Sequence, residues 1–181
     1  MSTIDSNKTK TIPYSLVKKY PGFEIRDYPS ILYASVLKKG KMMEVGKDGF
    51  RDLAGFIFGG NVKSQNIAMT APVTFQPSTE VEDRVEMSFT MPDGMTIENT
   101  PKPNYPQVRI KMSEPVRMAV ITFSGFANNQ KIEEKADQLR AMLKKNQMKW
   151  KEPCRFMAYN SPYRLFLRKN EVAFAVLDGV L

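Results

Sequence analysis

Residues 49–73 read GFRDLAGFIFGGNVKSQNIAMTAPV, and this stretch decides the fold. Four apolar side chains recur at intervals of three and four positions, the spacing of one face of an α-helix: Phe50, Leu53, Ala54 and Ile57. The Gly-Gly-Asn sequence at 59–61 is a helix stop signal. A strand is expected next, over residues 67–75. The stretch therefore predicts a helix, a tight turn and a strand in succession.

The predicted helix, residues 43–58, contains an excess of glycine. Gly46, Gly49 and Gly55 each lower helix stability by about 1 kcal/mol relative to alanine. Either another backbone or a flat ligand approaches the helix closely at these positions, or the helix begins with a frayed or kinked turn.

Outside this stretch, the sequence predicts one further helix and several strands. Residues 129–145 carry a second apolar stripe, and Asn128 or Asn129 is suited to cap it. The stripe consists of Ile132, Ala136, Leu139, Met142 and Leu143. Strands are expected at 23–26, 31–37, 67–75, 85–91, 108–112, 117–123, 150–159 and 171–176.

The two halves of the chain resemble each other. A strand, a helix and a strand at 31–75 correspond to the same succession at 117–159. We therefore predict an α+β domain in which duplicated strand-helix-strand repeats form a distorted antiparallel β-barrel flanked by two long α-helices. The domain is expected to span residues 20–181, with pseudo-repeats at about 20–92 and 105–178, after a flexible N-terminal segment, 1–19.

Composition excludes several classes of function. The 181 residues include no histidine and one cysteine, Cys154, so histidine-based catalysis, histidine ligation and a multi-cysteine zinc site are all excluded. The net charge is +8, but the basic residues are dispersed and not interleaved with aromatics, which argues against a nucleic-acid surface. The N-terminus is polar without an apolar leader, and no run is long enough to span a membrane. A cytoplasmic monomer without membrane insertion is expected.

The motifs together resemble those of the SOUL haem-binding protein family. The helix, the Gly-Asn turn and the MTAPV strand at 69–73 are similar to the family signature. Further similarity lies in FEIRDY at 23–28, SFTMP at 88–92, YNSP at 159–162 and RKNEV at 168–172. The resemblance covers about residues 20 to 176 in the family order.

This resemblance implies reversible binding of haem or a metal-free porphyrin in a groove beside the first helix. Phe50, Leu53, Ala54 and Ile57 would form the apolar wall, although Leu53 and Ile57 suit packing on the sheet better, and Phe50 and Ala54 suit it equally well. By position in the family pattern, Lys47 and Arg164 would meet the propionates.

The chain also departs from the family pattern. Asp27 stands where one branch of the family is thought to place an axial histidine, so iron ligation would fall to Cys154, Tyr163, a methionine or water. Gly55 stands where the family can carry a lysine. An alternative is therefore an effector-sensing or protein-interaction module that has lost haem binding. No acid–base pair is evident, and Glu171 is expected to be a structural partner of the charges at 168–169, so we predict a binding protein rather than an enzyme.

Overall fold

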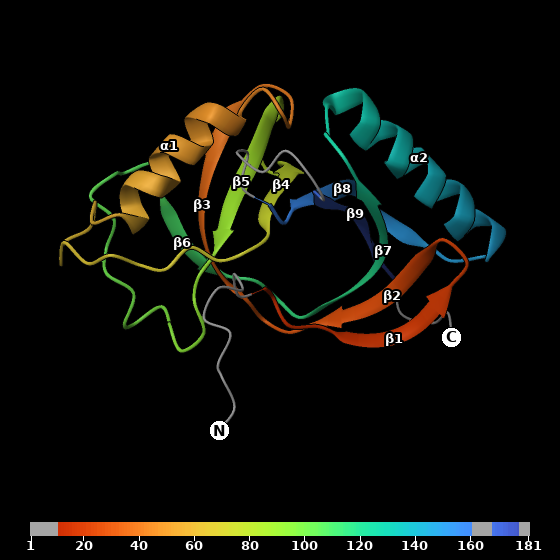
Figure 1. The fold of residues 1–181 in the computed structure, drawn as a ribbon, viewed down its shortest axis with the longest axis horizontal. Coiled ribbons are helices and arrows are strands. Elements are labelled where there is room, and N and C mark those ends of the chain that lie inside the picture. Colours follow the sequence, from red (N-terminus) through yellow and green to blue (C-terminus); the bar gives the residue numbers. More distant parts are fainter. Residues whose placement is uncertain (1–10, 161–167, 178–181) are drawn as a thin grey trace.

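The computed structural model describes residues 11–160 and 168–177, which form one antiparallel sheet and two helices (Figure 1). The helices are α1 (Gly46–Ile57) and α2 (Asn129–Lys145). The strands are β1 (Ser15–Tyr20), β2 (Phe23–Tyr28), β3 (Leu32–Lys39), β4 (Val73–Pro77), β5 (Arg84–Thr90), β6 (Arg109–Met112), β7 (Val116–Ser124), β8 (Trp150–Ala158) and β9 (Lys169–Val176). The predicted α+β class is confirmed.

The strand order of the sheet reflects the internal repeat. Hydrogen-bonded neighbours run β1-β2-β7-β9-β8-β4-β5-β3-β6. The central six strands are symmetric about the β8–β4 pair, because β7-β9-β8 on one side corresponds to β3-β5-β4 on the other. Each half places its helix between its first two strands, α1 after β3 and α2 after β7, as expected for two strand-helix-strand units.

The sheet is strongly curved but does not close into the expected barrel. β1 and β6 are its two edges, and they are not hydrogen-bonded to each other in the described chain. Side chains of strands that are distant in the strand order share one buried cluster, since Tyr33 of β3 and Met118 of β7 both belong to it.

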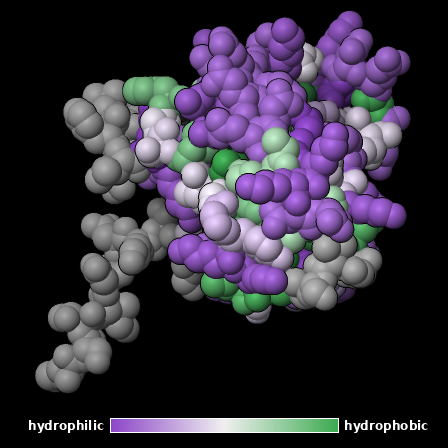
Figure 2. Space-filling view, turned by 90° about the vertical axis from the view of Figure 1, so that its right-hand side faces the viewer, coloured by the Kyte–Doolittle hydropathy of each residue, from purple (hydrophilic) through white to green (hydrophobic). Residues whose placement is uncertain are grey.

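One face of the sheet packs against the helices. α1 contributes Leu53, Phe56 and Ile57 to the main apolar core. α2 contributes four residues of the predicted stripe: Ile132, Ala136, Leu139 and Leu143. The side chain of Asn128 accepts a hydrogen bond of 2.8 Å from the Lys131 N–H, which identifies Asn128 as the cap. The side of the molecule that carries α2 is mostly hydrophilic on its outer surface (Figure 2).

The opposite face holds a second apolar cluster that includes Ile12, Tyr28 and Met157. Ile12 reaches it from the N-terminal segment, and its N–H donates to the Ala71 carbonyl at 3.2 Å. The described fold includes residues 11–19 of the N-terminal segment, because β1 pairs with β2 and Ile12 is buried. No helix in the described part of the chain is long and apolar enough to cross a membrane.

Candidate functional site

Glycine in α1 is explained by close approach of side chains. A Cβ atom on Gly49 would lie 2.6 Å from the Met87 Sδ, so the absence of a side chain at position 49 allows the helix to pack closely against β5. A Cβ atom on Gly55 would lie 3.0 Å from the Tyr105 Oη, on the side of the helix that faces away from the sheet. Gly49 and Gly55 therefore serve contacts with the side chains of Met87 and Tyr105, whereas a Cβ atom on Gly46, at the start of the helix, would meet Phe75 at an ordinary 3.9 Å.

One side of α1, together with the residue that caps its C-terminus, carries four residues at spacings of three and four positions: Lys47, Phe50, Ala54 and the cap residue Phe58. We call these four residues the Phe50 flank. Phe50 is half-buried and meets Phe89 of β5 edge-on, with ring centroids 5.4 Å apart. Ala54 is half-buried, Lys47 is exposed, and Phe58 at the helix end is 64% exposed. The flank thus presents an apolar strip with a cation at one end.

The other side of α1 is held by the rest of the protein. Asp52 forms an ion pair with Lys38 of β3 at 2.5 Å. Burial raises the pKa of the Asp52 carboxyl, but the bond to Lys38 acts in the opposite direction, and the pKa is lowered. Tyr105, from the long connector between β5 and β6, lies over Gly55. Lys38 therefore ties the helix to β3, and Tyr105 ties it to the connector.

The predicted site residues fall into three groups. Lys47, Phe50 and Ala54 lie together on the Phe50 flank. Leu53 and Ile57 are 0% and 1% exposed, so they pack on the sheet beneath the flank. Arg164 lies outside the described residues. The sequence did not predict that Phe58 is exposed beside these residues, because a phenylalanine at the end of an apolar helix pattern is typical of the buried core.

The Gly-Gly-Asn motif after α1 has a structural role. The buried Asn61 amide donates to the carbonyls of Phe56 at 3.1 Å and Gln65 at 2.8 Å. Its Oδ1 accepts from the N–H groups of Lys63 and Gln65. With all four bonds formed, Asn61 shapes the turn that leads from α1 towards the next strand.

Asp27, which the resemblance aligns with an axial histidine of one branch of the family, forms an ion pair. Arg117 of β7 donates from Nε to Oδ1 at 2.7 Å and from Nη2 to Oδ2 at 2.9 Å. This bidentate bond lowers the pKa of the Asp27 carboxyl. The position therefore joins β2 to β7.

Glu171 is the centre of a buried polar cluster on the face opposite the helices. The carboxylate is 0% exposed and pairs with Arg26 at 3.0 Å and Lys169 at 3.1 Å. The Tyr159 hydroxyl donates to it at 2.7 Å. Burial favours the protonated acid, but Arg26, Tyr159 and Lys169 outweigh it, and the pKa of Glu171 is lowered. Burial raises the pKa of Tyr28, which accepts from Arg26, to about 12.

The cluster bears out part of the expectation for Glu171. Lys169 is a partner, as predicted, but the buried partner is Arg26, which lies 145 positions away in the chain. Cys154 is also buried, and burial raises the pKa of its thiol to about 11. A neutral buried thiol is a poor metal ligand. Within residues 11–160 and 168–177, no three acidic, cysteine or histidine side chains gather as a metal-binding group.

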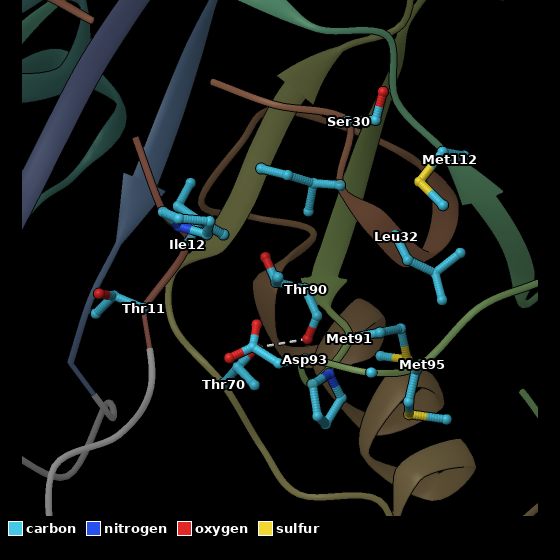
Figure 3. A pocket seen from close by; sticks show the side chains of 14 residues that line it. Thr11, Ile12, Ser30, Leu32, Thr70, Thr90, Met91, Asp93, Met95 and Met112 are labelled. Carbon is cyan, nitrogen blue, oxygen red and sulfur yellow. Dashed lines mark hydrogen bonds between the residues drawn. The ribbon is translucent and has the colours of Figure 1, made fainter. Parts of the chain in front are cut away.

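A cavity of about 190 Å³ lies where β5 ends and β3 begins (Figure 3). Its walls come from the N-terminal segment, the start of β3 and the turn after β5, and include Ile12, Leu32, Thr90, Met91 and Met95. Ligand pockets for drug-sized molecules span about 300–1,000 Å³. The cavity is therefore too small for a tetrapyrrole, and it contains none of the predicted site residues.

Comparison with known proteins identifies relatives along most of the chain. A family model described as SOUL heme-binding protein matches residues 9–175. Heme-binding protein 2 of Homo sapiens is 31% identical over 159 residues, which cover 84% of this chain and 77% of that protein. Heme-binding protein 1 of Xenopus laevis is 26% identical over 163 residues, covering 84% and 82%.

Solved structures share the fold at low identity. The C-terminal domain of EcmrR superposes with a TM-score of 0.64 at 10% identity, covering 92% of this chain and 99% of that one. A hydrolase from Listeria innocua gives a TM-score of 0.62 at 12% identity, covering 89% and 94%. At these identities, the likeness establishes a common fold and nothing of function.

Proposed function

Since the chain belongs to the SOUL heme-binding protein family, we propose that it is a small-molecule binding protein that takes haem or a metal-free porphyrin on the Phe50 flank of α1. The observation that carries the proposal is the flank itself. Phe50 and Phe58 offer flat apolar surface, Ala54 between them leaves room for a disc, and Lys47 supplies a cation at one end.

A tetrapyrrole fits this arrangement chemically. Its macrocycle is a flat apolar plate, and its propionates are anionic. Leu53 and Ile57 anchor the helix from beneath, so the flank is held on a rigid support. Lys47, with Arg164 assigned by the resemblance, would pair with the propionates through charge-assisted hydrogen bonds.

Binding without a histidine ligand follows from the sequence, which contains none. The buried, neutral Cys154 is a poor substitute. Affinity would then come from apolar contact and cations, and the ligand's iron would contribute little. Metal-free protoporphyrin is therefore expected to bind about as well as hemin.

A second candidate is an effector-sensing or protein-interaction module of the same fold. The position of Tyr105 favours this second candidate. The Tyr105 ring lies where a side chain longer than glycine would project from position 55, and this chain has no lysine at that position. Either function is one of binding, and we propose no catalysis.

Absorbance titration in the Soret region tests the proposal. Hemin and metal-free protoporphyrin are titrated separately into tag-free protein. The expected result is saturation at one ligand per chain for both, without the low-spin bands of imidazole-ligated haem. Failure of both to saturate would favour the second candidate.

A further inference from the structure

The end of the molecule that carries the C-terminus of α2 is rich in lysine. Here the last turn of α2, the turn between β1 and β2 and the start of β8 lie together (Figure 1). A Cβ atom on Gly22 would lie 3.0 Å from the Met142 Sδ, so the β1–β2 turn contacts α2. Five exposed lysines belong to these segments, and we call them the lysine rim: Lys18, Lys144, Lys145, Lys149 and Lys151.

Both the sequence and the contacts gather these lysines. Residues 144–151 contain four lysines and no acidic residue. Lys145 follows Met142 by three positions, so it lies on the side of α2 that meets the β1–β2 turn. Next to that turn, the Lys18 Nζ lies 4.9 Å from the centroid of the Tyr20 ring. The rim therefore combines lysines from segments that are more than 100 positions apart in the chain.

The positive charge of the rim is not balanced by neighbouring carboxylates. Among the described residues, no carboxylate forms an ion pair with a lysine of the rim. Arg140 already engages three carboxylates of α2 and β8: Glu133, Asp137 and Glu152. Uncompensated charge of one sign on one end of a protein attracts a partner of the opposite sign.

The aromatic side chains beside the rim are not available to stack with bases. Tyr20 is half-buried and stacks on Phe23, with ring centroids 4.7 Å apart. Trp150 is half-buried and packs against Phe174 at 6.4 Å. Single-stranded nucleic acids bind where exposed aromatic rings follow a basic groove, so the rim does not favour them.

An anionic lipid surface matches the rim better. Lysine is a compact, hydrated charge on a flexible stem, so several lysines act through their summed charge rather than through a fixed geometry. The rim also adjoins an apolar side chain: Leu177 is 37% exposed, and its N–H donates to the Lys149 carbonyl at 3.0 Å. Cations around an exposed apolar side chain suit anionic headgroups that overlie acyl chains. Figure 2 faces this end of the molecule, whose surface is mostly hydrophilic with small apolar areas.

We propose that the lysine rim is a docking surface for anionic lipid bilayers, on which the protein adsorbs with Leu177 at the level of the headgroups. The rim shares no residue with the Phe50 flank, so this inference does not depend on tetrapyrrole binding. Because α1 lies at the opposite end of the molecule (Figure 1), the bilayer leaves the flank open.

Co-sedimentation of the full chain with lipid vesicles tests the proposal. One set of vesicles is phosphatidylcholine alone, and the other contains about 30% phosphatidylserine, to supply the negative surface potential that attracts lysines. We expect saturable binding to the anionic vesicles and none to the neutral ones. Binding should weaken as sodium chloride is raised, because salt screens exposed charges.

Variants locate the surface. The triple variant K144Q/K145Q/K149Q is expected to lower the affinity for anionic vesicles about a hundredfold, since each lysine near the surface contributes about fivefold. The matched control is K41Q/K63Q/K102Q, which removes the same charge from exposed lysines outside the rim and should match the wild type. Should the triple variant fail to fold by circular dichroism, K149Q alone carries the test, with about a fivefold loss.

The apolar contact has its own pair of variants. L177S is expected to weaken vesicle binding about fivefold, because it removes an apolar side chain from the headgroup region. I97S is the control, since Ile97 is 52% exposed but lies in the connector between β5 and β6.

Three results would overturn the proposal. One is equal binding to neutral and anionic vesicles. Another is equal loss in the rim variant and its matched control, which would show that net charge alone attracts the protein. The third is binding of labelled oligothymidine that displaces the vesicles at lower concentration, which would make the rim a nucleic-acid surface.

Discussion

The hydroxyl of Tyr105 lies 3.0 Å from the point that a Cβ atom on Gly55 would occupy. Tyr105 belongs to the connector between β5 and β6, whereas Gly55 lies in the last turn of α1. The contact joins segments that are 50 positions apart, and it explains why a helix former is absent at position 55.

Coupling between these two residues is measurable. Gly55→Ala in a Tyr105→Ala background is expected to raise the free energy of unfolding by about 1 kcal/mol, the usual gain in helix propensity. In the wild type the gain is expected to be smaller, because Tyr105 must move. Urea unfolding of the four proteins gives the coupling energy, and strict additivity would contradict the contact.

The buried ion pair of Glu171 with Arg26 is expected to be sensitive to loss of one partner. Glu171→Gln leaves Arg26 with a buried charge that, among the described carboxylates, Glu24 alone then pairs with, and should cost about 3–5 kcal/mol. Lys169→Met removes the more exposed partner and should cost less than about 1 kcal/mol. Chemical denaturation compares the two variants, and equal losses would argue against the central role of Arg26.

The second helix is expected to be structural. Leu139 lies on the buried face of α2 and is fully buried, so Leu139→Ala should lower the free energy of unfolding by about 2–5 kcal/mol. The neighbouring Gln138 is exposed, and Gln138→Ala should change it by less than about 0.5 kcal/mol. A loss below about 1 kcal/mol for Leu139→Ala, measured by urea unfolding, would show that α2 packs loosely.

The Asp27–Arg117 pair should make stability depend on pH. The pKa of Asp27 is lower in the folded protein than its ordinary value, so the folded state binds fewer protons at this site than the unfolded state. The pair therefore stabilises at neutral pH, and its contribution is lost as the pH falls through the folded pKa. Asp27→Asn should lower the urea midpoint at about pH 6 and lower it less at about pH 3. A constant difference between variant and wild type would contradict this.

Local patterns predicted the helices and the repeat. The apolar stripe of α2 places its four fully buried residues as predicted, and the Asn128 cap was among two candidates. The similar halves anticipated the symmetric strand order. These features depend on side chains that are near one another in the chain, where periodicity is informative.

Contacts between distant segments could not be predicted in this way. Tyr105 over Gly55 and Arg26 beside Glu171 depend on how the sheet curves, which no local pattern encodes. The strand β1 escaped prediction because its sequence, SLVKKY, alternates poorly and its side chains are mostly exposed. The Phe50 flank was only partly anticipated, since exposure of Phe58 depends on where α1 ends.

The central claim is that a tetrapyrrole binds on the Phe50 flank, and position-specific hemin titration tests it most directly. Each flank variant is paired with a control on the exposed surface of α2: Ala54→Gln with Ala141→Gln, and Lys47→Glu with Lys145→Glu. Both lysine changes alter net charge equally, so any general charge effect cancels. The account predicts that Ala54→Gln and Lys47→Glu weaken hemin binding while both controls match the wild type, with about tenfold loss for Lys47→Glu if one charge-assisted bond is removed. Equal affinities for the flank variants and their controls, in folded proteins, would contradict the claim.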